Sequence, residues 1–177
     1  MIIPHIRIRK ILYATDLSDT ARYAFAYAVN LSQMYQAGLT ILHVMEEIPR
    51  MDERISSYIS EKQWEEIKQR NMDDARAVLI GKQQGHVTIG AVLEQFCAEA
   101  KKESGEPARF TVDEILIKRG NPVAKILEAA ELKGCDVIVM GMHGLGTLAK
   151  LVMGSTAQRV IQRSAIPVFV VKLPKTD

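Results

Sequence analysis

Glycines and hydroxyl residues gather after one strongly apolar segment in the second half of the chain. Gly141-Met142-His143-Gly144 directly follows Val137–Met140, and nine residues separate Gly144 from Gly154-Ser155-Thr156. Glycines at a junction between a strand and a helix let backbone amides approach an anion closely. The helix N-terminus adds unpaired N–H donors and the positive end of its dipole. The segment therefore predicts a phosphate-binding cradle.

Other chemistries find less support in the sequence. Four scattered histidines and two distant cysteines, Cys97 and Cys135, match no zinc-ligand spacing. The turn Thr15-Asp16-Leu17-Ser18 has no serine-and-glycine pyrophosphate loop, and no GxxxxGK phosphate loop occurs elsewhere. No side chain stands out as a base that would orient an attacking water. The sequence favours binding of a phosphate compound over its turnover.

The composition is that of an ordinary globular domain. The chain has 177 residues with 47% apolar and 25% charged residues, which suits one domain with a substantial core. Its net charge of +2 gives no support for a nucleic-acid or membrane-surface partner. Met1–His5 does not resemble a signal peptide, and no apolar run is long enough to span a bilayer. We expect a cytoplasmic protein with two packed thiols.

The elements that must position the glycines alternate between strand and helix patterns. Apolar runs typical of strands cover Ile8–Ala14, Leu39–Met45, Phe110–Lys118, Asp136–Met140 and Val168–Val171. The helix after the first run begins at the N-cap Ser18 and is closed by Gly38. Asn121 and Pro122 start the helix that Gly134 ends, and another helix runs from Ser155 to about Arg163.

This alternation predicts one doubly wound α/β domain spanning residues 1–177. Nearly continuous apolar strands separated by amphipathic helices indicate a parallel sheet covered on both faces. We expect five strands in the order 3-2-1-4-5 with right-handed crossovers. We expect residues from about 48 to 108 to form a long helical crossover, either two helices or one bent helix.

The cradle is expected at the point where the winding direction of the sheet switches. Ligands of open parallel sheets bind there, beyond the carboxyl ends of the strands. With the first and fourth strands adjacent, Ala14-Thr15-Asp16 would lie beside Gly141–Gly144, and His43-Val44-Met45 would flank the same crevice. Phosphates could contact Gly144 and the amides of Gly154-Ser155-Thr156, with the rest of the ligand near Asp16 and Val44.

At these residues the chain resembles the universal stress protein family, specifically its ATP-binding branch. That branch carries the pattern read here as Gly141-x2-Gly144-x9-Gly154-Ser155, with its spacing intact. The resemblance covers the chain except for about residues 48–108. Four further blocks agree in order, namely Lys10–Asp16, Leu42-His43-Val44, Gly120-Asn121-Pro122 and Ile166-Pro167-Val168.

The resemblance implies a role for each part of the crevice. The backbone around Ala14 and Thr15, with the Asp16 carboxylate, would contact the adenosine part of ATP. The main chain at Val44 would hydrogen-bond the adenine edge.

On the phosphate side, the resemblance implies that Gly141, His143 and Gly144 line the ribose and phosphates. Gly154, Ser155 and Thr156 would hold the phosphates. Amides and hydroxyls can bind phosphate without a lysine, and a divalent metal, Mg²⁺ or Mn²⁺, bridging the phosphates would help.

Several of these residues have a simpler interpretation. Asp16 could merely cap the following helix alongside Ser18, and His143 could be a solvent-facing loop residue. His43 is interpreted as a strand-end histidine with satisfied hydrogen bonds. Ser155 is expected to be an N-cap in either case, since capping and phosphate binding use the same geometry.

The resemblance implies an ATP-binding, dimeric, nucleotide-dependent regulator or sensor in stress response. The edge strand Val168–Val171 would pair with the same strand of a second subunit, because an exposed apolar edge invites aggregation unless it is covered. The alternatives are a slow ATPase or adenylyl-transfer enzyme, and a dimeric scaffold that has lost its nucleotide.

Overall fold

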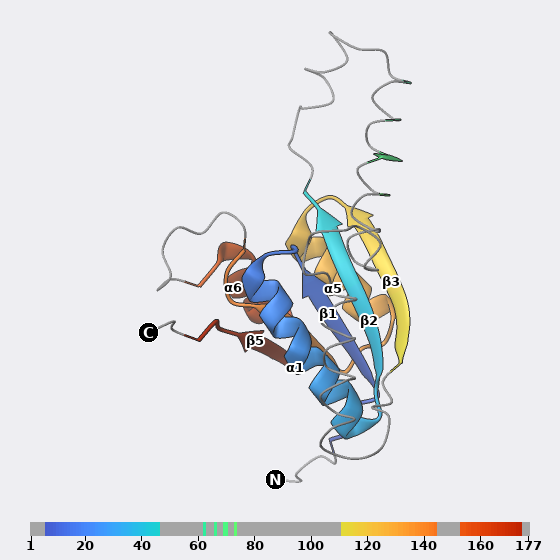
Figure 1. Cartoon of the computed structure of the whole chain (residues 1–177), viewed down its shortest axis with the longest axis vertical. Helices are drawn as coiled ribbons and strands as arrows, with labels where there is room; N and C mark the ends of the chain where they lie inside the picture. The colour runs from blue at the N-terminus through green and yellow to red at the C-terminus, as the bar shows by residue number, and fades with distance from the viewer. Residues whose placement is uncertain are drawn as a thin grey trace.

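A five-stranded parallel sheet forms the centre of the molecule (Figure 1). The computed structural model describes residues 6–46, 111–144 and 153–174, with five helical residues between 62 and 73. The strand order β3-β2-β1-β4-β5 confirms the predicted topology. The strands are β1 (Lys10–Thr15), β2 (Gly38–Met45), β3 (Val112–Arg119), β4 (Val137–Gly141) and β5 (Val168–Val171). The predicted helical crossover from about 48 to 108 lies outside the described residues apart from those five.

Helices cover both faces of the sheet, as predicted (Figure 1). α1 (Asp19–Tyr35) packs on one face, over β4, β1 and β5. α5 (Pro122–Leu132) and α6 (Ser155–Arg163) contact each other and cover the opposite face. No helix in the described ranges is long and apolar enough to cross a membrane.

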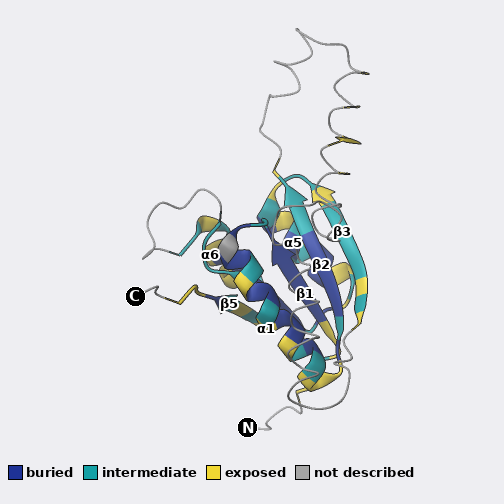
Figure 2. Ribbon diagram, in the orientation of Figure 1, coloured by how far each residue is buried: buried dark blue, intermediate teal, exposed yellow. Residues whose placement is uncertain are grey.

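The core lies in two layers, one on each side of the sheet. On β1, Ile11 and Tyr13 join the cluster under α1, whereas Leu12 and Ala14 join the cluster under α5 and α6. Because both faces of this strand are buried, its apolar run is continuous rather than alternating. Figure 2 shows this burial along β1.

The residues between α1 and β2 refine the predicted boundaries of these two elements. The left-handed residue that ends α1 is Gln36, with φ of 52°, and not Gly38, which opens β2. A side chain on Gly38 would collide with the carboxylate of Asp113. The prediction that Gly38 closes the helix was therefore wrong, since this glycine makes room for a neighbouring strand.

The predicted caps of α1 and α5 are confirmed. Ser18 Oγ accepts a hydrogen bond from the Ala21 amide, and Asn121 Oδ1 accepts one from the Ala124 amide at 3.1 Å. Gly134 follows the end of α5 with a φ of 60°, the left-handed conformation that glycine adopts readily.

Candidate functional site

A cavity of about 690 Å³ opens at the carboxyl ends of the central strands. Its size is within the range of small-molecule binding sites. All ten site residues predicted from the sequence line it, namely Ala14, Thr15, Asp16, Val44, Gly141, His143, Gly144, Gly154, Ser155 and Thr156. The sheet register explains this convergence, because Ala14 pairs with Leu42 on one side and with Met140 on the other.

The lining also includes residues that the sequence analysis did not assign to the site. Glu46 continues the line of β2 into the cavity, and Pro122 and Ile126 bring the first turns of α5 to it. The helix start at Pro122 was recognised, but nothing in the sequence showed that α5 faces the glycine segment.

The turn between β1 and α1 is held by its own side chains. Thr15 Oγ1 accepts a hydrogen bond from the Leu17 amide at 3.0 Å, and Asp16 Oδ1 accepts one from the Ser18 amide at 3.0 Å. Leu17 has a φ of 67°, a conformation that side chains other than glycine and asparagine seldom adopt. Such strain costs about 1–3 kcal/mol and is found most often at functional sites.

Asp16 therefore holds the turn before α1 through the amide of the N-cap residue Ser18, and it also faces the glycine segment. A Cβ atom added to Gly144 would lie 2.6 Å from Oδ2 of Asp16. A Cβ at this position would force the Asp16 carboxylate to shift, so glycine at residue 144 allows the carboxylate and the loop backbone to lie this close.

Gly141 is also required by close packing within the protein. A Cβ atom there would lie 3.0 Å from Cγ2 of Thr20 and 3.1 Å from the amide nitrogen of Ala21. The end of β4 thus fits against the first turn of α1. This contact brings the β1–α1 turn and the loop after β4 to the same side of the cavity.

The N-terminus of α6 opens on the cavity without a side-chain cap. Its N-cap residue is Gly154, and Ser155 is the first residue of the helix, so the prediction of Ser155 as N-cap was wrong. The Gly154 amide donates to the carbonyl of Met142 at 2.9 Å. This hydrogen bond holds Gly154 at the N-cap position, one residue before the predicted cap Ser155. Among the residues that the structure describes, no side chain caps the first amides of α6, which are thus available to a ligand or water.

The two cavity histidines are held differently. His43 Nδ1 lies 2.8 Å from the carbonyl oxygen of Thr15, so His43 is a strand-end histidine with a satisfied ring, as interpreted. Both ring nitrogens of His143 are buried, and within the described chain they have no hydrogen-bond partner. His143 is therefore not a solvent-facing loop residue.

The described lining of the cavity carries carboxylates and no basic side chain besides histidine. Asp16 and Glu46 are present, and no lysine or arginine is among the lining residues that the structure describes. No group of three metal-ligating side chains occurs in that part of the chain. An anionic ligand would thus meet amides, hydroxyls and imidazole, and a bridging cation would have to come with it.

Two ionisable groups close to the sheet are fixed in their neutral forms by burial. Burial raises the pKa of Tyr13 well above its usual value, and its hydroxyl donates to the Ala21 carbonyl at 2.6 Å. Burial also raises the pKa of the Cys135 thiol, which packs in the core as expected. Cys97 lies outside the described residues.

Comparison with known proteins agrees with this architecture. Residues 7–172 match the universal stress protein family. The universal stress protein in the QAH/OAS sulfhydrylase 3′ region of Thermus aquaticus is 31% identical over 93% of this chain and 98% of its own length.

Solved structures give the same result. Universal stress protein MJ0577 of Methanocaldococcus jannaschii superposes with a TM-score of 0.68 at 28% identity, covering 97% of this chain and all of that one. A universal stress protein solved in complex with cAMP has the same fold, with a TM-score of 0.51 at 20% identity over 94% of this chain and 98% of that one. The chain belongs to the universal stress protein family.

Proposed function

We propose that this protein binds ATP in the cavity and acts as a dimeric, nucleotide-dependent regulator or sensor in stress response. The observation that carries the proposal is the convergence of the ten predicted residues on one cavity of about 690 Å³. The glycine pattern spans Gly141 to Ser155, and it meets the β1–α1 turn only through tertiary contacts.

The phosphates would lie against Gly144 and the N-terminus of α6. Support comes from Gly154, which starts the helix without a side-chain cap. Donors that no side chain occupies, at the positive end of a helix dipole, favour an anion. The hydroxyls of Ser155 and Thr156, on the first turn, could add two further hydrogen bonds.

The adenosine part would lie toward β1 and β2. Ala14 and Thr15 end β1, Val44 lies near the end of β2, and Asp16 begins the turn that follows β1. The Asp16 carboxylate would accept from the ribose, and the main chain at Val44 would pair with the adenine edge. The cAMP complex of a protein with this fold supports the choice of an adenine nucleotide.

A divalent cation, Mg²⁺ or Mn²⁺, would accompany the phosphates. The described lining offers two carboxylates and no lysine or arginine to balance the charge of a triphosphate. Hard cations of this kind bind phosphate oxygens and keep several waters, so they need few protein ligands. When bound, the cation would neutralise charge between the phosphates.

The dimer would form through β5. Within the described residues β5 has a neighbour only on its β4 side, so its other edge is open. Open edges of apolar strands tend to pair with another chain. Val168–Val171 is therefore the proposed pairing strand.

The test is calorimetric titration of ATP, with and without Mg²⁺, together with the nucleotide content of the purified protein. Wild type should bind, whereas Gly144→Val should not, since its side chain would displace Asp16 and crowd the phosphates. Gly134→Asn is the matched control, because Gly134 has no atom within 4 Å of an added Cβ and asparagine tolerates its φ of 60°. Absence of binding by wild type, or equal binding by Gly144→Val, would refute the site.

A phosphate-release assay separates a regulator from an enzyme. We expect no more than slow turnover, because the sequence contains no evident base for an attacking water. Turnover of many cycles per minute would instead support an ATPase or adenylyl-transfer enzyme. A dimer that binds no nucleotide would support the scaffold.

A further inference from the structure

Three aromatic side chains form one exposed surface along α1 and β5. The ring centroids of Tyr23 and Tyr27 lie 5.6 Å apart, and those of Tyr27 and Phe169 lie 5.8 Å apart. The exposed fractions are 37% for Tyr23, 40% for Tyr27 and 40% for Phe169. We call these three residues the aromatic surface. Contiguous exposed aromatic groups of this kind are enriched at protein interfaces.

The aromatic surface continues directly from the open edge of the sheet. Phe169 is the second residue of β5 and contacts Tyr27, so it lies on the α1 side of the strand. Val168 and Val170 pack on the opposite side, under α5 and α6. Figure 2 shows α1 and β5 side by side, which agrees with the contacts between them. Any chain that pairs with β5 must therefore meet Phe169 and, next to it, Tyr27.

Pairing through β5 alone would make a small interface. The strand has four residues, which span roughly 13 Å at about 3.3 Å per residue. Specific interfaces bury about 800 Å² on each partner. A single short strand falls well below that area, so a stable contact must also use the surface beside the strand.

The symmetry of a dimer decides which surface that is. Two copies of β5 that pair as antiparallel neighbours are related by a twofold axis perpendicular to the sheet. This axis keeps the α1 layers of both copies on the same side of the joined sheet. Since directly opposed residues of an antiparallel pair share a face, Phe169 of one copy would oppose Phe169 or Val171 of the other.

We propose that the aromatic surface is the second part of the contact between two copies of this chain, where Tyr23, Tyr27 and Phe169 anchor the β5 pair. This inference rests on the proposed dimer and names the side chains that stabilise it. Large, rigid aromatic groups carry a disproportionate share of interface energy, and tyrosine suits a surface that is exposed in the free subunit.

The test compares Tyr27→Glu with Met34→Glu by sedimentation over a range of protein concentrations. Met34 lies two turns further along α1, is 71% exposed, and has no ring contact with β5. We expect Tyr27→Glu to weaken dimerisation at least about a hundredfold, since a buried charge replaces a central aromatic anchor. Met34→Glu should dimerise like wild type. Both variants should bind ATP as wild type does, because neither residue lines the cavity.

A second measurement needs no variant. Hydroxyl-radical footprinting of wild type, read by mass spectrometry, should show Tyr23 and Tyr27 protected at high protein concentration and reactive after dilution below the dissociation constant. Met34 should stay reactive at both concentrations.

Each outcome separates this inference from the proposed dimer. A wild-type monomer at all concentrations would remove both. A dimer that survives Tyr27→Glu, or that Met34→Glu disrupts equally, would overturn the aromatic contact and leave the β5 pair standing. Protection of Tyr23 and Tyr27 that does not change on dilution would show that the surface is covered by the chain's own residues, which also overturns the inference.

Discussion

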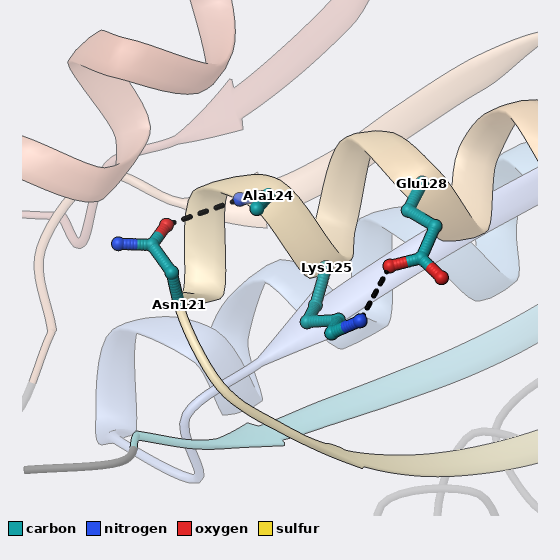
Figure 3. Close-up of polar contacts among 4 residues, drawn as sticks. All are labelled: Asn121, Ala124, Lys125 and Glu128. Atoms are coloured by element: carbon teal, nitrogen blue, oxygen red, sulfur yellow. Dashed lines mark hydrogen bonds and ion pairs between the residues drawn. The ribbon is translucent and has the colours of Figure 1, made fainter.

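The N-termini of α5 and α6 differ although the two helices lie side by side on one face of the sheet. At α5, Asn121 caps the helix through its side chain (Figure 3). Pro122 occupies the first turn of the same helix. At α6, Gly154 holds the cap position and provides no side-chain hydrogen bond. Glycine at the N-cap leaves a helix less stable than asparagine does, by about a few tenths of a kcal/mol.

The difference shows where the protein stabilises a helix and where it keeps donors available. The first turn of α5 reaches the cavity through Pro122, which has no N–H to offer. The first turn of α6 reaches it through Ser155 and Thr156, and the N-cap residue Gly154 has no side chain to compete for their amides. The less stable end is the one suited to an anion, and four predictions follow this contrast from the largest effect to the smallest.

The largest effect is expected from making α6 resemble α5. Gly154→Asn would place a capping oxygen over the first-turn amides, and we expect ATP to bind at least about thirtyfold more weakly, ~2 kcal/mol. Calorimetry measures this, and circular dichroism confirms the fold, since the added Cβ would lie 3.2 Å from the Met142 carbonyl. Unchanged ATP affinity would mean that the amides of α6 do not hold the phosphates.

Next is His143, which lies in the lining beside α6. Because both ring nitrogens are buried without a partner among the described residues, His143→Leu should raise the free energy of unfolding by about 1.5 kcal/mol. Urea denaturation without nucleotide measures the change. His43→Leu is the contrasting variant and should destabilise, because it removes the hydrogen bond to Thr15. Loss of stability in His143→Leu would show that the ring has a partner.

Gly154→Asn should weaken ATP binding, whereas removing the cap of α5 should lower stability and leave ATP binding nearly unchanged. Asn121→Ala leaves the Ala124 amide without its acceptor and should lower the free energy of unfolding by about 1 kcal/mol. ATP affinity should stay within about twofold of wild type, because Asn121 is not among the described residues that line the cavity. A large loss of ATP binding would mean that both helix ends serve the site.

The smallest effect is expected at the ion pair on the exposed side of α5, between Lys125 and Glu128 at 2.6 Å (Figure 3). The hydrogen bond from Lys125 holds the pKa of Glu128 below its usual 4.5. A lowered folded-state pKa gives stability that is present at neutral pH and is lost as pH falls through that pKa.

Lys125→Met should therefore destabilise less than Asn121→Ala at pH 7, and the difference from wild type should become smaller at a pH below 4.5. Denaturation at the two pH values tests this. In a Glu128→Gln background, the change in the free energy of unfolding caused by Lys125→Met should not depend on pH. A dependence on pH there would assign the effect to another group.

Much of the fold and the site follows from local patterns. The continuous apolar runs predicted buried parallel strands, because a strand covered on both faces needs no polar side. The strand order followed from the alternation of elements. The ten predicted lining residues followed from the glycine spacing together with the family resemblance, whereas Glu46, Pro122 and Ile126 were not predicted. Asn121 and Ser18 were recognised as caps because capping depends on a few adjacent residues.

The tertiary structure decided what depends on contacts between distant segments. Gly38 makes room for Asp113, Gly144 makes room for Asp16, and Tyr27 meets Phe169. The hydrogen bond from the Gly154 amide to Met142, across a loop, moved the start of α6 away from the predicted Ser155 cap. The sequence by itself determined which residues could bind phosphate and form strands, since these are properties of residue type and spacing. Which atoms face one another was set only when packing brought separate segments of the chain into contact.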